Sequence, residues 1–419
     1  MRAVTRNLLP DEGASDLAAP SFWACPEAER SAAFARLRAC GSPRFFRRPG
    51  RRGGFYALVR HDEVGAASKR PDLFSSEPSA TTPPPPRWVR AVFGDSMVNM
   101  DGARHTDLRR IVQKAFTPRR VALIEDSISR ICTEIVDDVL ARRSGDFVSM
   151  VAAPLSTHVI CDMLGIPPGR RGAVLAQVTG STELIGVEGD QRPWLRLPGR
   201  NLAALARMHL LVRILGAQRR RRPTGDLIST LVTADVDGER LGGRQLGAFF
   251  SLLLVAGIET TRNAVAHGLR LLSEHPDQCA LLVSDLDRHL DGAVEEILRC
   301  ATPITQFRRH VTQDCEWRGS TFRTGDEVVL FYASANRDER VFPDAGTFDI
   351  RRAPNPHLAF GGTGPHYCLG AHLARTQLRM VLRELLTRAP GIRMVGEPVY
   401  VPSSFDNRIR RLVFTVDAL

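Results

Sequence analysis

One cysteine has neighbours that could hold a metal. Cys368 lies in a glycine-rich stretch from Phe360 to Gly370, and an amphipathic helix is predicted to begin directly after this stretch. A sulfur at the amino end of a helix is favoured as a thiolate, because the helix dipole is positive there. Glycines on both sides let backbone N–H groups turn toward the sulfur and let a flat, bulky group approach the main chain. The sequence therefore predicts a thiolate-bound metal centre at Cys368.

A carboxylate and a hydroxyl stand side by side at the end of the most apolar run of the chain. Glu259 and Thr260 follow the run 246–258, which predicts a buried helix that is too short to span a bilayer. A carboxylate in such a place is costly unless it is paired or used. Two interpretations stay open: Thr260 bonds to its own helix while Glu259 pairs with Arg262, or the two side chains handle protons.

The loop around Cys368 resembles the haem-ligand loop of the cytochrome P450 family. The family pattern is Phe-x-x-Gly-x-x-x-Cys-x-Gly, and Gly364, Cys368 and Gly370 match it in register. Phe360 precedes the cysteine by eight residues, where the family usually has seven. We interpret this departure as a one-residue insertion in the glycine run. It puts the packing of Phe360 against the sulfur in question but leaves the ligand unchanged.

The resemblance implies a haem b (iron protoporphyrin IX) cofactor and residues that bind it. Cys368 would ligate the iron, and Phe360 and Gly370 would shape the loop around the sulfur. The two propionates need cations and imidazoles able to make charge-assisted hydrogen bonds. Arg308 remains an alternative at one of these positions, because it adjoins the residue that matches. The side chains that match the family's propionate-binding positions are His105, Arg109, Arg309 and His366.

The same resemblance places Ala256, Glu259 and Thr260 on the oxygen-binding side of the haem. In the family the threonine donates a hydrogen bond there and the acid helps to deliver protons. O2 is then a co-substrate, and thiolate ligation favours cleavage of its O–O bond. The implied reaction puts one oxygen atom into a C–H bond or an alkene and reduces the other to water.

Glu296 and Arg299 resemble the structural Glu-x-x-Arg pair of the family. Residues three apart on a helix share a face and can pair, so the spacing alone says little. The resemblance implies that this pair anchors the segment leading into the haem loop, with an arginine as the third partner. Arg351 and Arg352 are both candidates, and the sequence does not choose between them.

The elements around these motifs predict a mainly α protein with a smaller β-rich part, and the resemblance implies the cytochrome P450 fold. We expect one domain over 1–419, with a helix-rich core at about 61–300 and the haem-ligand loop at 360–370. The β-rich parts are expected at about 44–60 and 305–419, the first as a hairpin around a glycine-rich turn. Three segments are predicted to be irregular: an arm at 1–30, a loop at 74–98 and a mobile lid at 169–198.

Charge and cysteine usage bound the partners and the compartment. The net charge is +11, and lysine occurs only at 69 and 114, so the basic residues are almost all arginine. Two explanations stay open. A GC-rich genome favours arginine codons, or a basic surface docks an acidic partner. No basic run is interleaved with aromatic residues, so nucleic acid is not expected. Eight cysteines without a Cys-x-x-Cys pair, and no apolar signal core at the start, predict a reduced, cytoplasmic setting.

The expected function is that of a haem-thiolate monooxygenase that hydroxylates or epoxidises an apolar small molecule, such as a sterol, terpenoid, alkyl chain or natural-product intermediate. No flavin or nicotinamide fingerprint is present, so the resemblance implies a separate ferredoxin and ferredoxin reductase as electron donors. We expect a monomer without a membrane partner. Two alternatives stay open: oxidative coupling or ring closure in natural-product biosynthesis, and a non-catalytic haem-binding auxiliary. Candidate substrate contacts, each equally placed to be core, are Trp88, Phe93, Met97, Leu184, Ile185, Trp194, Phe249, Phe250, Leu253 and Phe307.

Overall fold

The structure of the protein is a computed structural model that describes most of the 419 residues. Helices form the larger part of the described residues and short strands the smaller part, which confirms the predicted mainly α fold. The described ranges are 16–41, 43–49, 53–81, 96–113, 116–117, 121–122, 124–182, 199–224, 226–233, 235–236, 239–240 and 243–417.

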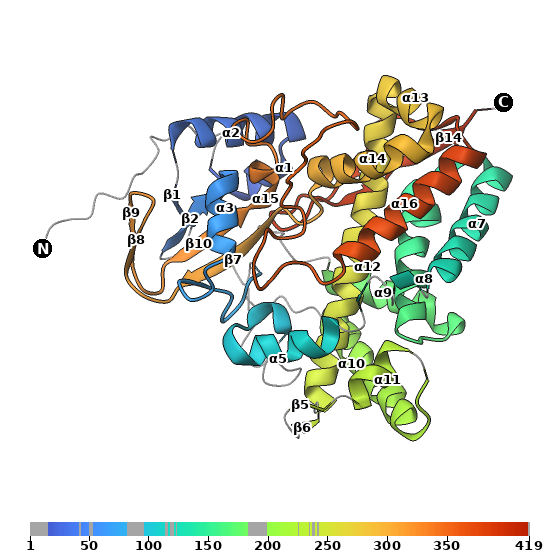
Figure 1. Cartoon of the computed structure of the whole chain (residues 1–419), viewed down its shortest axis with the longest axis horizontal. Coiled ribbons are helices and arrows are strands. Elements are labelled where there is room, and N and C mark those ends of the chain that lie inside the picture. The colour runs from blue at the N-terminus through green and yellow to red at the C-terminus, as the bar shows by residue number, and fades with distance from the viewer. Residues whose placement is uncertain are drawn as a thin grey trace, which may run out of the picture.

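Most of the helices gather on one side of the molecule, and the largest sheet lies on the other side with the first helices of the chain (Figure 1). Short 3-10 turns are η1 (Met97–Asn99) and η3 (Pro168–Arg170), and η2 (Val148–Ala152) is a π-helical turn. The α-helices are α1 (Pro20–Ala24), α2 (Glu27–Cys40), α3 (His61–Ser68), α5 (Gly102–Gln113), α7 (Glu125–Arg142), α8 (Ala153–Met163), α9 (Arg171–Thr182), α10 (Gly199–Arg221), α11 (Leu227–Thr233), α12 (Gly243–Glu274), α13 (Pro276–Ser284), α14 (Leu286–Ala301), α15 (Tyr332–Ala335) and α16 (Ala371–Arg388).

The largest sheet has five strands in the order β1-β2-β10-β7-β3. The predicted hairpin is confirmed, because β1 (Arg44–Arg47) and β2 (Gly54–Leu58) pair in antiparallel register. Next to them β10 (Glu327–Phe331) runs parallel to β2 and antiparallel to β7 (Gln306–Val311). The edge strand β3 (Phe74–Ser75) lies at the start of the segment predicted to be an irregular loop.

The remaining strands form small sheets of two or three strands. One of them contains β14 (Val413–Val416), which lies in the part at 305–419 that is expected to be β-rich. A three-stranded sheet has the order β11 (Ile392–Met394), β14 and β4 (Ser144–Asp146), and the two-stranded pairs are β5 (Asp235–Val236) with β6 (Glu239–Arg240), β8 (Cys315–Trp317) with β9 (Ser320–Phe322), and β12 (Val399–Tyr400) with β13 (Ile409–Arg411).

The apolar run at 246–258 forms the first half of α12, which passes through the helical part beside α8, α10, α14 and α16 (Figure 1). The neighbouring helix α8 comes very close at one glycine. A Cβ atom at Gly257 would lie only 2.5 Å from Cδ1 of Ile160, so a larger residue would force the Ile160 side chain to move. Among the described residues, no helix is both long and apolar enough to cross a bilayer.

The core of the described structure has one large hydrophobic cluster and two smaller ones. The large cluster joins buried faces of α7, α8, α10, α12, α14 and α16. The two smaller clusters lie against the largest sheet, where the rings of Trp23 and Phe331 stack with centroids 6.1 Å apart. The motif-bearing elements α12, α14 and α16 all belong to the large cluster, so the candidate site is built on well-packed helices.

Two of the segments predicted to be irregular contain helices instead. In the predicted arm, α2 begins directly after Pro26 and buries Phe34 against Phe331. In the predicted lid, α9 contains two glycines, yet Val174 and Val178 are buried in the large cluster. Burial of these apolar side chains outweighs the low helix propensity of glycine. The other parts of these segments, 1–15 and 183–198, lie outside the described residues.

Candidate functional site

The cysteine loop ends where α16 begins, as the sequence predicts. Gly370 lies at the N-cap of α16, and the backbone N–H of Cys368 donates a hydrogen bond of 3.0 Å to the carbonyl of Phe360. The Cys368 thiol is accessible although it lies deep among protein atoms. This desolvation raises its pKa, against the Gly370 N–H and the charges of Arg109 and Arg375, which lower it. A metal cation at the sulfur would favour the thiolate outright.

The extra residue in the loop is absorbed by two consecutive glycines. Gly361 and Gly362 have φ angles of +93° and +70°, a conformation that residues with a side chain rarely adopt. The Phe360 ring lies under the guanidinium of Arg375, whose Cζ is 4.5 Å from the ring centroid. Gly364 has no room for a Cβ atom, because the backbone of Ser68 passes too close. The loop is therefore held tightly against α3 despite its unusual length.

The structure brings the residues predicted to bind propionates close to the cysteine loop. The rings of His105 on α5 and His366 have centroids 4.3 Å apart. Arg109, one turn along α5, donates a hydrogen bond of 2.6 Å to the carbonyl of Tyr367. Burial, with the nearby charges of His366 and Arg109, lowers the pKa of His105 to about 4, so this imidazole is neutral at pH 7.

The strand β7 separates the two neighbouring arginines that the sequence could not tell apart. Arg308 pairs with Glu327 at 3.4 Å and donates a hydrogen bond to the carbonyl of Ser79. Arg309 points the other way, as alternate residues of a strand do, and its charge lowers the pKa of His366, which burial lowers most. Among the described residues Arg309 has no carboxylate partner, so its charge is available to an anionic group.

A carboxylate that the sequence analysis missed lies beside the loop histidine. Nε2 of His366 is 2.8 Å from Oδ1 of Asp101, and the other carboxylate oxygen, Oδ2, accepts hydrogen bonds from Ser75 and Ser76. Burial alone would raise the pKa of Asp101, but these bonds hold it below its usual range. A single Asp before a helix carries no distinctive signal in sequence. Because His366 already has an anionic partner, its role toward a propionate stays a prediction.

On α12 both contacts of the purely structural interpretation are present. The Thr260 hydroxyl donates a hydrogen bond to the Ala256 carbonyl of its own helix. Arg262 pairs with Oε2 of Glu259 at 2.5 Å, and Nε of Arg408 lies 3.8 Å from the same oxygen. The other oxygen, Oε1, is buried and has no hydrogen-bond partner in the described structure. Burial raises the pKa of Glu259, although both arginines oppose this.

One face of α12 remains accessible although most of the helix is buried. Ala256 is exposed, and Leu252 and Thr260, one turn to either side, are partly exposed. Residues four apart lie on the same side of a helix. The accessible face is therefore apolar and carries one hydroxyl, that of Thr260. The role of these residues on an oxygen-binding side stays a prediction.

The Glu-x-x-Arg pair forms a fully buried network on α14, and the structure identifies its third partner. The side chains of Glu296 and Arg299 are completely buried and pair at 2.7 Å. Nε of Arg352 lies 3.2 Å from Oε1 of Glu296, whereas Arg351 is exposed and pairs with Asp349 beside it. Arg299 also donates hydrogen bonds to three backbone carbonyls of the segment that precedes the haem-ligand loop. Arg352 is thus the third partner.

A second ion network, which the sequence analysis missed, joins both ends of the cysteine loop. Glu295 on α14 accepts hydrogen bonds from Arg375 on α16 at 2.6 and 2.8 Å, and Nε2 of His357 lies 3.0 Å away. Burial would raise the pKa of Glu295, but these partners lower it to about 2. The residues lie before and after the loop in sequence, so only the fold brings them to one carboxylate.

Half of the candidate substrate contacts lie outside the described residues, and the other half are mostly core. Phe307 on β7 is partly buried and its ring lies 5.5 Å from that of Phe405. Outside the described residues are Trp88, Phe93, Leu184, Ile185 and Trp194; in the large buried cluster are Met97, Phe249, Phe250 and Leu253.

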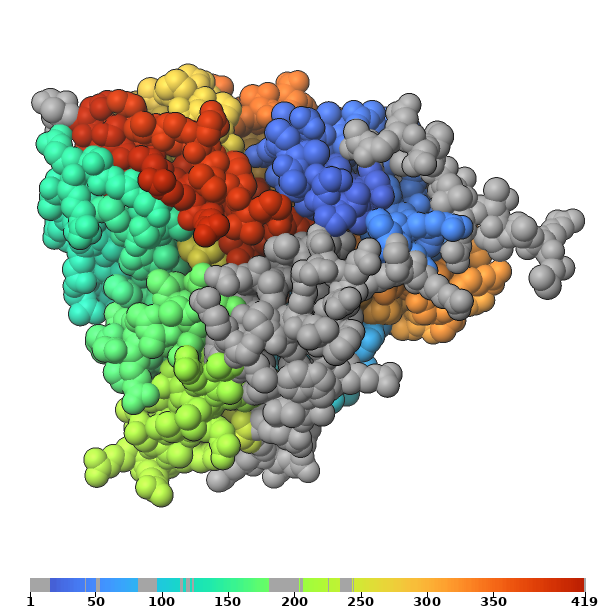
Figure 2. Space-filling view, turned by 180° about the vertical axis from the view of Figure 1, so that it is seen from behind, coloured from blue at the N-terminus to red at the C-terminus, as the bar shows by residue number. Residues whose placement is uncertain are grey.

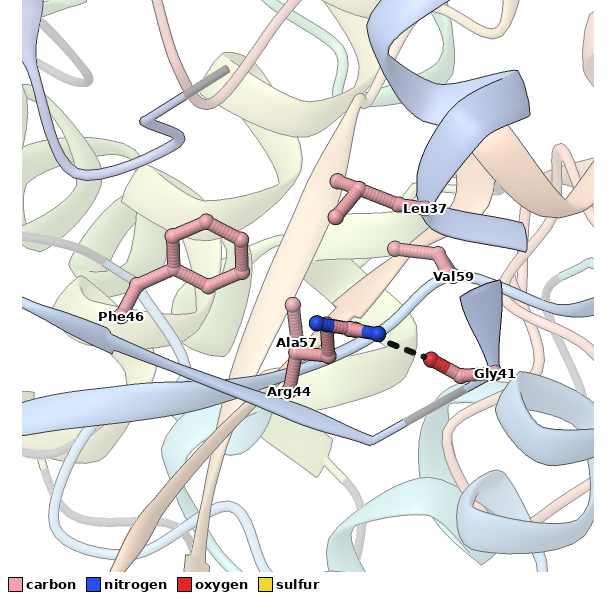
Figure 3. A pocket seen from close by; sticks show the side chains of 6 residues that line it. All are labelled: Leu37, Gly41, Arg44, Phe46, Ala57 and Val59. Atoms are coloured by element: carbon pink, nitrogen blue, oxygen red, sulfur yellow. Dashed lines mark hydrogen bonds between the residues drawn. The ribbon is translucent and has the colours of Figure 1, made fainter. Parts of the chain in front are cut away.

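A small pocket elsewhere is unrelated to this site. It is too narrow to hold a water molecule and lies between α2 and the hairpin of β1 and β2 (Figure 3). Arg44 partly fills it and donates a hydrogen bond of 3.4 Å to the carbonyl of Gly41. Its lining residues are Leu37, Gly41, Arg44, Phe46, Ala57 and Val59, none of which belongs to the cysteine loop or to α12.

The residues around Cys368 fit the haem that the sequence resemblance implies. The accessible thiol has a backbone N–H, that of Gly370, directed at it, and a Cβ atom on Gly370 would lie 4.0 Å from Sγ. Arg109 and Arg309 supply positive charge on the side that faces His366. A soft sulfur donor beside cations suits a metal macrocycle that carries carboxylates.

Comparison with known proteins supports the same assignment. The cytochrome P450 family model matches residues 211–388. A methyl-branched lipid omega-hydroxylase of Mycobacterium tuberculosis is 41% identical over 409 residues, which cover 96% of this chain and 94% of the relative. A steroid C26-monooxygenase of the same species is 35% identical over 365 residues, which cover 85% and 81%.

Solved structures agree with these sequence relatives. A cytochrome P450 of Mycobacterium marinum in complex with pseudoionone matches with a TM-score of 0.89 and 38% sequence identity. The match covers 98% of this chain and 100% of that chain. The cysteine loop and the buried Glu-x-x-Arg network agree with these matches, and the relatives are named as hydroxylases and monooxygenases. This chain therefore belongs to the cytochrome P450 family of monooxygenases.

Proposed function

We propose that this monooxygenase hydroxylates an aliphatic carbon of an apolar lipid or a steroid-like molecule. The observation that carries the proposal is the accessible face of α12, where Leu252 and Ala256 offer apolar contact beside the single hydroxyl of Thr260. Ligand sites of this composition favour apolar molecules that are oriented by few polar groups. Relatives named for oxidation of methyl-branched lipids and of steroids support the same substrate class.

The site residues have separable tasks in the proposed reaction. Haem, when bound, supplies the activation of O2 for insertion of one oxygen atom into the substrate. Cys368 would hold the iron. The haem propionates would be held by His105, Arg109, Arg309 and His366. These side chains fix the orientation of the group relative to α12.

Proton handling falls to α12 in this proposal. Glu259 has one oxygen held by Arg262 and one without a hydrogen-bond partner in the described structure, and its raised pKa brings proton exchange closer to neutral pH. Thr260 can exchange its bond to the Ala256 carbonyl for one toward the reacting side.

A titration followed by turnover tests the proposal. The purified haem protein is titrated with methyl-branched fatty acids, steroids, terpenoids and aromatic peptides while the Soret band is recorded. Compounds that shift the band are then incubated with a ferredoxin, its reductase and a nicotinamide donor. We expect lipids or steroids to shift the band and to gain one oxygen atom on an aliphatic carbon.

Two outcomes would overturn the proposal. Products that are coupled or cyclised without gaining oxygen would establish the alternative of oxidative coupling. Absence of product with every compound that shifts the band, although electrons are consumed, would favour a haem-binding auxiliary. Carbon monoxide added to the reduced protein serves as the control, because thiolate ligation by Cys368 gives a characteristic long-wavelength Soret band.

A further inference from the structure

The outward face of α10 exposes apolar and basic side chains together. Leu210 and Ile214 are one turn apart and expose 56% and 40% of their surface, which places both among the few exposed large hydrophobic residues of the described structure. Ala206 and Ala217 extend the same exposed face. The opposite face of the helix is buried in the large cluster through Met208, Leu211, Val212 and Leu215. The helix therefore has apolar residues on both sides, and only one side is covered.

Arginines surround this exposed apolar stripe. Arg207 and Arg213 lie three residues from Leu210 on either side, and α10 contains no aspartate or glutamate. Arg219 is neutralised by Asp226 at 2.5 Å. The others are exposed and have no ion-pair partner within the described part of the chain: Arg207, Arg213, Arg220, Arg221 and Arg222.

We propose that this face of α10 docks the protein peripherally on an anionic membrane surface. Guanidinium groups bind lipid phosphates through paired hydrogen bonds, and each such cation strengthens binding to an anionic leaflet about fivefold. Exposed aliphatic side chains add affinity by entering the boundary between headgroups and acyl chains. The basic rim and the apolar centre of this face match those two layers.

A protein partner fits this face less well. Specific protein interfaces are enriched in aromatic residues at their centres, and α10 contains no Phe, Tyr or Trp. A lipid surface requires only charge and a few aliphatic tips. The segment containing α10 and α11 lies at the outer edge of the molecule (lime in Figure 2), where a flat surface can reach it.

Such peripheral contact needs no membrane-spanning helix. It differs from the sequence-based expectation of no membrane partner, because that expectation considered only segments long enough to insert. The inference does not depend on the proposed reaction. It concerns surface residues of α10 that are remote in sequence from the cysteine loop, so it can fail while the monooxygenase assignment stands.

Vesicle sedimentation with the full-length haem protein tests the inference. Vesicles of phosphatidylcholine with 30 mol% phosphatidylglycerol, roughly the charge density of an anionic leaflet, are compared with pure phosphatidylcholine at low salt. We expect binding to the anionic vesicles alone and its loss as salt is raised. Arg207→Gln with Arg213→Gln should lower the partition coefficient more than tenfold, about fivefold for each arginine. Leu210→Ser with Ile214→Ser should lower it about tenfold.

Matched pairs elsewhere on the surface provide the controls. Val283→Ser with Val399→Ser removes two aliphatic side chains that are 36% and 48% exposed, and Arg410→Gln with Arg411→Gln removes two exposed charges. The valine pair should leave binding to the vesicles unchanged. The arginine pair should reduce this binding less than threefold, because it changes only the net charge of the protein.

Each of the following results would overturn the inference. The first is absence of sedimentation with anionic vesicles at low salt. The second is equal loss in the control pairs and the α10 pairs. The third is that the protein binds soluble polyglutamate but not vesicles, and that the α10 substitutions abolish the binding to polyglutamate. That result would assign this face to an acidic protein partner. Sedimentation velocity without lipid completes the test, since a dimer that Leu210→Ser dissociates would assign the face to a second copy.

Discussion

At the scale of single residues, Thr260 carries the sharpest open question, because its hydroxyl bonds to its own helix and also lies on the accessible face of α12. We expect Thr260→Ala to raise the hydrogen peroxide released per electron pair and to lower product formation, since a proton donor near the oxygen side is lost. The measurement is peroxide against product at fixed electron consumption. Thr260→Ser, which keeps the hydroxyl, should restore most of the product. Equal peroxide release in all three proteins would show that the hydroxyl serves only the helix.

The residue scale also shows where sequence information ends. Cys368 and Gly370 could be assigned from local spacing, because the loop pattern and the start of α16 lie within a few residues of each other. The choice of Arg352 over Arg351 could not be made from the sequence, because the two residues are neighbours. Only their distances to Glu296 and Asp349 in the folded protein distinguish them. Asp101 was missed for the same reason. Its partner His366 is 265 residues away in sequence.

At the scale of elements, the Glu295 network joins α14 and α16 across the cysteine loop. The pKa of Glu295 falls from an ordinary 4.5 to about 2 in the folded protein, so its ionised form stabilises the fold above pH 4.5. That stability is lost as pH falls from about 4.5 to about 2. We expect Glu295→Gln to lower the free energy of unfolding at pH 7 by about 2 kcal/mol, after allowance for partial exposure. Denaturant unfolding at a series of pH values measures this.

The pH profile separates this network from a general loss of charge. In Glu295→Gln the decline in stability between pH 4.5 and pH 2 should be shallower than in the unchanged protein. Glu397, which is exposed and has no ion-pair partner in the described structure, gives the matched control, and Glu397→Gln should change the free energy of unfolding by less than about 0.5 kcal/mol. Identical pH profiles for all three proteins would contradict the assignment.

The two neighbouring arginines after α15 provide a second test at the element scale. Arg352→Ala removes a partner of the fully buried Glu296 and three hydrogen bonds to backbone carbonyls. We therefore expect it to lower the free energy of unfolding by about 3 kcal/mol. Arg351→Ala removes only an exposed pair with Asp349 and should cost less than about 1 kcal/mol. Thermal unfolding and haem content after purification report both changes. A larger loss in Arg351→Ala would reverse the assignment.

Helices and strands could be predicted where the local sequence specifies them, and could not where packing against distant segments stabilises them. The apolar run of α12 and the glycine turn between β1 and β2 each specify their element locally. By contrast, α9 contains two glycines and is stabilised by burial of Val174 and Val178, which no local rule anticipates. The register of β10, parallel to β2 and antiparallel to β7, also depends on segments far apart in the chain.

At the scale of the whole molecule, the net charge of +11 bears on electron delivery, for which we propose an acidic ferredoxin. Long-range attraction speeds the encounter of oppositely charged proteins and is screened within about 10 Å at 0.1 M salt. Reduction of the haem by the ferredoxin should therefore slow about tenfold or more as ionic strength rises from about 0.05 to 0.5 M. Stopped-flow absorbance in the presence of carbon monoxide follows this step. Dithionite, a small reductant that needs no docking, serves as the control and should show a much weaker salt dependence. If reduction by ferredoxin were as fast at high salt as at low salt, the net positive charge would have no part in the encounter with the ferredoxin.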